Sequence, residues 1–264
     1  MKADIIVLTY GNEDLSCRCF RALRKHTVGY RLIWVDNGSG PRSIDMVWPE
    51  AMACAQMVPM FLSQNEGFIG GTNAALRLLL EVFNTDADYV ALLNNDVEIS
   101  EGWLDRMSRV MERDHTVMAV GPVTSECASW QSFMNARCIV PAFQVPAGFE
   151  RLDSAERASR LDYCYGELGF KCNMLAFFCT VFRTEVFRKL GYLDERFGIG
   201  LGDDDDLCKR MHDENMKLAL SMGTYVFHNH GATFQQMFSD EEIIAMRKER
   251  LATYREKHGE DAKV

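Results

Sequence analysis

Short apolar runs alternate with segments of helical spacing along the first half of the chain. Continuous apolar runs of this length are typical of strands buried on both faces of a parallel sheet, and they occupy residues 5–8, 32–35, 56–62 and 89–93. Helical spacing predicts helices at residues 13–26, 70–84 and 101–113. The alternation predicts an α/β fold with a doubly wound, mostly parallel sheet flanked by helices. Ligands of such folds bind at the carboxyl ends of the strands.

The second half is less regular. Residues 125–168 show no clear period, so they are either packed surface loops or a variable wall that contacts a second substrate. Beyond them we expect a strand at 176–182, a helix capped by the hydroxyl of Thr184, and a strand region at 217–227. The charged residues 240–264 predict a surface helix. No linker divides the chain, which predicts a single domain.

Polar clusters follow three of the predicted strands. They are Thr9-Tyr10, Asp36-Asn37 and Asn94-Asn95-Asp96. Since parallel strands end at one edge of a sheet, these clusters are expected to lie together. An acid in the position of Asp36 can accept hydrogen bonds from a base or a ribose hydroxyl, although Asp-Asn-Gly is equally typical of a simple turn.

The sequence Asn65-Glu66-Gly67-Phe68-Ile69-Gly70-Gly71-Thr72-Asn73 is a glycine-rich turn that opens a helix. Glycines let the backbone approach a ligand closely, and a helix N-terminus favours a phosphate group. The turn is neither a Walker loop nor a Rossmann fingerprint. An ordinary strand-to-helix turn explains the glycines equally well.

Four consecutive aspartates occupy positions 203–206. Neighbouring carboxylates raise one another's pKa, which makes one of them a better proton acceptor near neutral pH. The same residues would also favour the dipole of a helix predicted at 205–215, and both roles can hold at once. Asp96 and His228 are candidate metal ligands, although each is also typical of a structural position. Carboxylate and imidazole together suit Mn²⁺ better than Mg²⁺.

Composition narrows the function classes. Lys and Arg number 29 and Asp and Glu number 38, so the net charge is −9 and no basic stripe favours nucleic acid as a partner. The nine cysteines show no zinc-finger spacing, as in a reduced cytosolic protein. No signal-peptide pattern begins the chain, and no apolar stretch approaches the roughly 20 residues that span a bilayer. We therefore expect a soluble, cytoplasmic protein.

Seven motifs in order over about residues 4–234 resemble glycosyltransferase family 2, the inverting nucleotide-sugar enzymes of GT-A fold. The rhamnosyltransferase-like branch, which serves polysaccharide biosynthesis, is the most similar. The matching stretches are residues 6–10, 35–39, 65–73, 93–97, 191–197, 203–210 and 228–234. The resemblance implies one GT-A domain. Residues 1–123 form its nucleotide-sugar-binding half, 124–239 its acceptor and catalytic half, and 240–264 a C-terminal surface helix.

The resemblance also implies roles for single residues. The nucleotide-sugar site would include Thr9, Tyr10, Asp36, Asn65, Gly67, Gly70, Asn73 and Asn95. Asp96 and His228 would bind the divalent metal, Mn²⁺ more readily than Mg²⁺. Asn94 departs from the DxD-type element of the family, which often begins with Asp.

In the acidic run, Asp204 corresponds to the catalytic base and Asp203 to a residue that contacts the acceptor. The assignment of the base within 203–206 stays open by one position. The donor would be a UDP- or dTDP-sugar, and the acceptor a glycan or a lipid-linked saccharide. A lipid-linked acceptor would bring the protein to the periphery of a membrane.

Two other functions are compatible with an acidic α/β protein. A sugar nucleotidyltransferase would carry a basic, glycine-rich loop after the first strand, but residues 9–14 contain no Lys or Arg. A non-catalytic nucleotide-sugar-binding protein would be expected to lose its catalytic carboxylates first, and both acidic clusters are intact.

Overall fold

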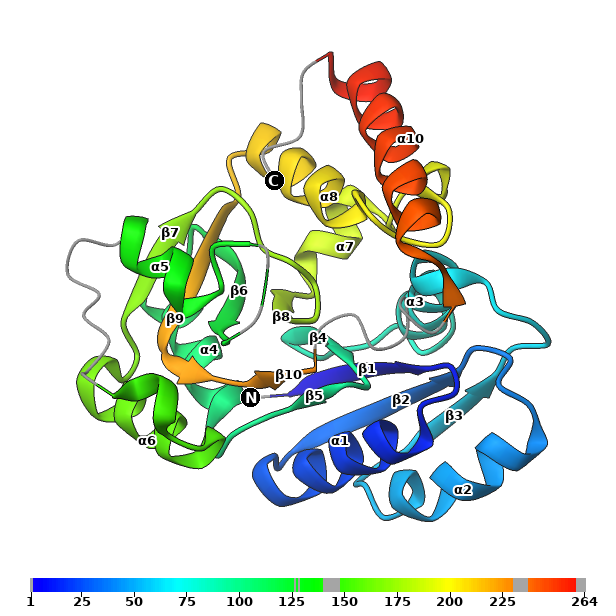
Figure 1. Cartoon of the computed structure of the whole chain (residues 1–264), viewed down its shortest axis with the longest axis horizontal. Helices are drawn as coiled ribbons and strands as arrows, with labels where there is room; N and C mark the ends of the chain where they lie inside the picture. Colours follow the sequence, from blue (N-terminus) through cyan, green and yellow to red (C-terminus); the bar gives the residue numbers. More distant parts are fainter. Residues whose placement is uncertain (1, 126, 128, 140–147, 230–236, 260–264) are drawn as a thin grey trace.

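An eight-stranded sheet in the order β3-β2-β1-β4-β8-β6-β9-β7 forms the centre of the molecule (Figure 1). The computed structural model describes residues 2–125, 127, 129–139, 148–229 and 237–259. The strands are β1 (Ala3–Thr9), β2 (Tyr30–Asp36), β3 (Val58–Phe61), β4 (Tyr89–Asn94), β6 (Val117–Val123), β7 (Gly169–Cys172), β8 (Cys179–Arg183) and β9 (Lys217–Tyr225). A separate antiparallel pair joins β5 (Val97–Glu98) to β10 (Phe227–His228).

Helices cover both faces of this sheet. One face carries α1 (Glu13–His26), α2 (Pro41–Met52) and α4 (Trp103–Arg113), whose apolar side chains share a core with Trp34. The other carries α3 (Gly67–Arg77), α5 (Phe133–Ile139), α6 (Ser154–Tyr165), α7 (Glu185–Leu190) and α8 (Asp203–Asp213). The predicted α/β arrangement of a mostly parallel sheet between helices is therefore confirmed.

The first four strands in sheet order, β3, β2, β1 and β4, run parallel and end together. Thr9 pairs with Asp36 across β1 and β2, and Leu8 pairs with Asn94 across β1 and β4. The polar residues that follow these strands consequently meet at one edge, as the sequence predicts. This edge is where ligands of parallel α/β sheets bind.

Two strands of the sheet run the opposite way. β8 lies antiparallel between β4 and β6, and β7 is antiparallel to β9 at the edge. β8 begins beside the end of β4, where the amide of Asn94 donates to the carbonyl of Phe178 (2.8 Å). The uniformly parallel pattern of a doubly wound sheet is therefore found only in the first half, because β8 is antiparallel to both of its neighbours in the sheet.

Several predicted boundaries need correction. The helix predicted at 70–84 is α3 followed by a π-helical turn at Leu78–Val82, and the helix predicted at 205–215 begins at Asp203. The proposed cap at Thr184 is wrong: its hydroxyl donates to the carbonyl of Ala87 (2.7 Å), so it ties α7 to the turn before β4. The hydrogen bond to Ala87 takes the place of the expected capping hydrogen bond within α7.

The described residues of the segment 125–168 include helices that neither interpretation of its sequence predicted. The segment contains α5, α6 and a 3₁₀ turn at Phe149–Arg151. A capping box formed by Asp153 and Glu156 starts α6, and this spacing was visible in the sequence. Helix α2 and strands β6 and β7 also went unpredicted.

The last element, α10 (Asp240–His258), is a largely exposed helix that packs against α8 and the turn before it (Figure 1). Another capping box, from Ser239 and Glu242, begins it. Its buried side chain is Tyr254, which joins the core on the α8 face. Among the described residues, no helix is both long and apolar enough to cross a membrane.

Candidate active site

The ends of β1 and β2 form a buried polar corner. The hydroxyl of Thr9 accepts a hydrogen bond from the indole of Trp34 (2.9 Å) and lies 3.5 Å from Oδ1 of Asp36. The other carboxylate oxygen of Asp36 accepts from the amide of Ser39 (3.0 Å). Tyr10 follows, half-buried. Thr9 thus helps to fix the orientation of the Asp36 carboxylate.

Asn37 organises the neighbouring glycine-rich turn, a role that sequence reasoning did not assign. Its side-chain amide donates to Oδ1 of Asn65 (2.8 Å) and to the carbonyl of Gly67 (3.1 Å), and its Oδ1 accepts from the amide of Glu66 (3.0 Å). Asn65 also accepts from the amide of Gly67 (2.9 Å) and contacts the sulfur of Met237. The signal was the amide next to Asp36 at the end of a strand.

Gly67 brings this turn against the segment that leads to the acidic run. Its φ is +70°, and a Cβ atom added there would lie 2.5 Å from Cα of Ile199. The next amide, of Phe68, donates to the carbonyl of Ile199 (2.9 Å). Gly70 is confined differently, since a Cβ atom there would lie 2.7 Å from Cβ of Glu66. The two motifs thus meet through backbone.

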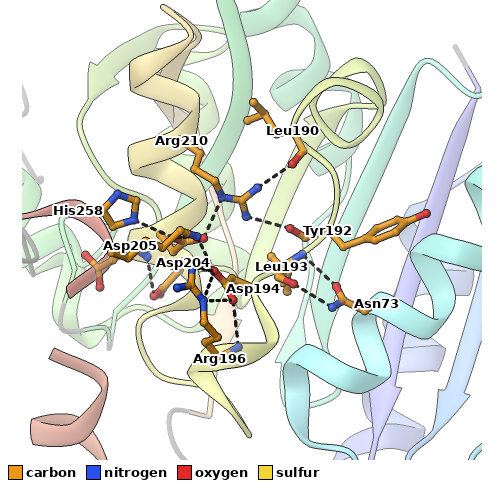
Figure 2. Close-up of polar contacts among 12 residues, drawn as sticks. Asn73, Leu190, Tyr192, Leu193, Asp194, Arg196, Asp204, Asp205, Arg210 and His258 are labelled. Atoms are coloured by element: carbon orange, nitrogen blue, oxygen red, sulfur yellow. Dashed lines mark hydrogen bonds and ion pairs between the residues drawn. The ribbon is translucent and has the colours of Figure 1, made fainter. Parts of the chain in front are cut away.

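Asn73 forms a second link between the same segments. Its side chain is 0% exposed and pairs with both backbone groups of Leu193, donating to the carbonyl (2.9 Å) and accepting from the amide (3.0 Å) (Figure 2). It also donates to Glu195 (3.2 Å), which pairs with Arg77. These contacts make Asn73 a support for the site, and its burial gives no support to the predicted contact with the nucleotide-sugar.

Asp96 and His228 lie together beyond β4. Nε2 of His228 is 3.4 Å from Oδ1 of Asp96, and this oxygen is buried without a hydrogen bond to any described residue. Pairing of β5 with β10 and stacking of His228 on Phe178 (4.5 Å between ring centroids) hold the two side chains. A buried carboxylate oxygen without a hydrogen bond, facing an imidazole, fits a divalent cation.

The neighbouring Asn95 does not point into this pair, since its amide donates to the hydroxyl of Ser16 on α1 (2.9 Å). Within the ranges that the structure describes, no three His, Cys, Asp or Glu side chains are arranged to hold a metal ion. Among the described residues, we therefore identify no protein ligand for a metal ion in addition to Asp96 and His228.

All four aspartates of the acidic run lie in the first turn of α8, which follows Gly202 at a φ of +102°. Burial raises the pKa of Asp203 well above its usual range, with the charge of Asp204 adding to the effect. Burial raises the pKa of Asp204 to about 6 and that of Asp205 to about 8. The expected direction is right, but burial rather than crowding by like charges is the larger cause.

The four carboxylates have different surroundings. Asp206 is enclosed by cations, and Asp205 lines a small cavity with Cys208 and Tyr254 on the side of α10. Asp203 is 4% exposed, which leaves its predicted contact with an acceptor without support from its accessibility. Asp204 is the half-buried member of the run, and its Oδ1 accepts from the amide of Asp205 (3.0 Å).

Residues 4–191, which make up most of the chain, match the family model described as Glycosyl transferase family 2. The chain belongs to glycosyl transferase family 2. No match was found among curated proteins. The family expected from the seven motifs is thereby confirmed, while its rhamnosyltransferase-like branch stays a prediction.

Solved structures share the fold at low sequence identity. The mannosyltransferase PcManGT from Pyrobaculum calidifontis, in complex with GDP-Man and Mn²⁺, is 13% identical with a TM-score of 0.63, over 98% of this chain and 65% of that one. GalNAc-T7 with UDP, GalNAc and Mn²⁺ is 12% identical with a TM-score of 0.62, over 86% of this chain and 43% of that one.

The structure of S. aureus TarS residues 1–349 in complex with UDP-GlcNAc is 13% identical with a TM-score of 0.60, over 96% of this chain and 66% of that one. This chain therefore spans less than two thirds of the length of each of these three proteins. At such identities the likeness establishes the GT-A fold.

Gly67→Ala should lower the free energy of unfolding by about 3 kcal/mol or more, because the new methyl group meets the backbone of Ile199 in addition to the strain of a positive φ. Gly29→Ala is the matched control: its φ is +68°, and a Cβ atom there meets nothing within 4 Å. That control should cost about 1 kcal/mol. Urea unfolding measures both, and equal costs would contradict the close approach of the two segments.

Proposed function

We propose that this chain is a metal-dependent inverting glycosyltransferase. It moves a sugar from a nucleoside-diphosphate sugar to a hydroxyl group of an acceptor, with Asp204 as general base. The observation that carries the proposal is the half-buried Asp204, whose pKa is raised to about 6, on a helix joined to the glycine-rich turn through Ile199. Membership of glycosyl transferase family 2 supports the reaction class.

The donor binds at the carboxyl ends of β1, β2 and β4. Asp36, Asn65 and Tyr10 surround the nucleoside, Gly67 and Gly70 lie under the diphosphate and sugar, and Thr9, Asn73 and Asn95 support this surface. A UDP- or dTDP-sugar is our first choice of donor. A GDP-sugar is added to the donors to be tested because PcManGT was solved with GDP-Man.

Asp96 and His228 bind the divalent metal, Mn²⁺ more readily than Mg²⁺. Oδ1 of Asp96 and Nε2 of His228 supply its protein ligands, which suits a cation whose other ligands are diphosphate oxygens and water. Such a cation neutralises charge on the diphosphate leaving group. The Mn²⁺ in the structures of GalNAc-T7 and PcManGT supports a divalent ion as the cofactor.

The chain's own residues carry out the proton transfer. Asp204 accepts the proton of the acceptor hydroxyl as its oxygen attacks the anomeric carbon from the face opposite the nucleotide. The bond to the diphosphate oxygen breaks in the same displacement, which inverts the anomeric centre. A carboxyl with a pKa near 6 is ionised at pH 7 and is still a stronger base than an exposed aspartate.

The acceptor is a glycan or a lipid-linked saccharide, bound by the half of the domain at residues 124–239. Cys127, after β6, is near enough to Asp204 that the carboxylate adds to the rise in pKa that burial causes in this thiol. In this proposal the acceptor reaches Asp204 from the side of Cys127, and the more buried Asp203 supports Asp204. We place the enzyme in polysaccharide biosynthesis, in the cytoplasm or at the periphery of a membrane.

A non-catalytic nucleotide-sugar-binding protein is the alternative, and a sugar nucleotidyltransferase is a weaker one. The family match over residues 4–191 counts against the nucleotidyltransferase. Both alternatives leave the raised pKa of Asp204 without a role. Release of nucleoside diphosphate from a sugar donor separates the enzyme from the binding protein.

Asp204→Asn should lower sugar transfer by about a hundredfold or more, because the amide cannot accept the acceptor's proton. Nucleotide binding, measured by calorimetry with UDP, dTDP and GDP, should be unchanged. Asp213→Asn, an exposed position at the other end of α8, is the control and should keep full activity. An active Asp204→Asn variant would contradict the assignment of the base and move it to Asp203 or Asp205.

Transfer should slow as the pH falls through about 6, since protonated Asp204 cannot act as a base. The loss should be about tenfold for each pH unit well below that value. It is measured as the initial rate of nucleotide release from pH 4.5 to 8.5 at saturating donor. A rate that stays constant down to pH 4.5 would show that the base is an ordinary exposed carboxylate.

Asp96→Ala and His228→Ala should each weaken binding of nucleotide with Mn²⁺ by about tenfold or more, which is about 1.4 kcal/mol. Each variant removes one of the two proposed protein ligands. Binding without metal, measured with EDTA, should not change. The exposed His115→Ala is the control. Wild-type affinity in both variants would overturn the metal site.

A further inference from the structure

The last aspartate of the acidic run is held by the end of the chain's last helix. Asp206 is 0% exposed and accepts from Arg210 one turn later (2.9 Å). Its other oxygen lies 2.5 Å from Nζ of Lys257 and 2.8 Å from Nε2 of His258, both on α10. Figure 2 shows His258 on one side of α8 and the side chain of Arg210, which belongs to α8, on the other.

Lys257 joins a third element to this cluster. Its Nζ is also 2.6 Å from Asp194, in the turn before Glu195–Phe197. Asp194 accepts in addition from Arg196 (Figure 2), and Lys257 and Arg196 together hold the pKa of Asp194 well below its usual range. One ammonium group therefore connects α10, α8 and the turn that Asn73 of α3 binds through Leu193.

Because Asp206 is buried, its charge has to be paired. A carboxylate as buried as that of Asp206 is stable only with cations or hydrogen-bond donors around it, and removal of one partner is costly. Residues three apart on a helix share a face, so Asp206 lies behind Asp203 in the first turn of α8. Any movement of Asp206 therefore moves the turn that carries Asp203 and Asp204.

We propose that Lys257 and His258 are positioning residues for the acidic run. By pairing with Asp206 they hold the first turn of α8 in place, and the charge of Lys257 balances part of its negative charge, so that Asp203 and Asp204 keep their places at the site. This inference rests on the proposed function only in taking the acidic run to be catalytic. The pairing itself acts on the carboxylates whether or not a donor is bound.

The charges that face Asp206 come from three elements. Arg210 and the carboxyl groups of Asp203 to Asp205 belong to α8, Asp194 and Arg196 to the turn around Glu195–Phe197, and Lys257 and His258 to α10. Loss of the Lys257 charge leaves the run more negative. Loss of the Asp206 charge leaves it less negative, with Arg210 and Lys257 still present.

The test is a titration of the aspartate carboxyl groups by ¹³C NMR in the full chain without ligand. Lys257→Met should raise the pKa of the Asp203 to Asp205 group by roughly half a unit to one unit, because a neighbouring cation is removed. Asp206→Asn should lower it, because the charge of Asp206 raises the pKa of Asp203. Lys248→Met, at an exposed lysine of α10, is the control and should leave it unchanged.

Hydrogen exchange measures the positioning directly. The amides of the first two turns of α8 should exchange at least about tenfold faster in Lys257→Met and in His258→Gln than in wild type. Lys257→Arg keeps the charge and should restore slow exchange and the wild-type pKa, which separates this role from general loss of stability. Thermal melting confirms that each variant is folded.

Shifts in the same direction for Lys257→Met and Asp206→Asn, or no shift in either, would overturn the proposal. So would unchanged exchange in α8, or a Lys257→Met variant that does not fold while Lys257→Arg behaves no better. None of these measurements uses a donor. Failure of the glycosyltransferase assignment, seen as absence of nucleotide binding with Mn²⁺, is therefore a separate result.

Discussion

Three of the four adjacent aspartates at the start of α8 are buried and the fourth is half-buried, and the surrounding structure has to compensate for that burial. Burial of a charge costs free energy, and the chain meets this cost in two ways. Asp206 stays paired with the cations Arg210 and Lys257 and within hydrogen-bond distance of His258. Asp203 and Asp205 instead have raised pKa values, so they favour the neutral form. Between them, Asp204 is a half-buried residue whose pKa is raised to about 6, which suits its carboxyl to accept a proton.

Helix α3 connects this run to the edge of the parallel strands. At its first residue, Gly67 touches the backbone of Ile199, and two turns along Asn73 binds the backbone of Leu193. Both contacts depend on specific residues, a glycine in the left-handed region and a fully buried amide. The distance between the proposed donor surface and Asp204 is consequently set by packing within the protein. A preorganised arrangement of this kind avoids reorganisation during reaction.

The sequence allowed the first half of the fold to be predicted, because its continuous apolar runs and helical spacing are local signals. Strands 5–8, 32–35 and 89–93 lie within β1, β2 and β4, and their polar ends meet as expected. The reversed strand β8 was not predictable as such, since an antiparallel neighbour has the same apolar pattern as a parallel one. Thr184 failed as a cap because a tertiary acceptor, the carbonyl of Ala87, is available.

Motif reasoning was informative about the site in the same uneven way. It brought Asp96 together with His228, which β5 and β10 place side by side. It did not distinguish ligand contacts from supports: Asn37 organises the glycine-rich turn, and Asn73 faces the protein interior. Nor could charge counting alone reveal that Lys257 and His258 approach Asp206 from about 50 residues later along the chain. Long-range ion pairs leave no periodic signal in a sequence.

The most direct test of the account is a crystal structure of the protein with Mn²⁺ and UDP, dTDP or GDP, with anomalous data at the manganese edge. The account predicts one manganese ion bound by Asp96 and His228. It also predicts that diphosphate oxygens complete the coordination and that Asp204 faces the position of the sugar. Manganese bound instead by the aspartates of α8, with Asp96 and His228 unoccupied, would contradict the division between a metal site and a catalytic base.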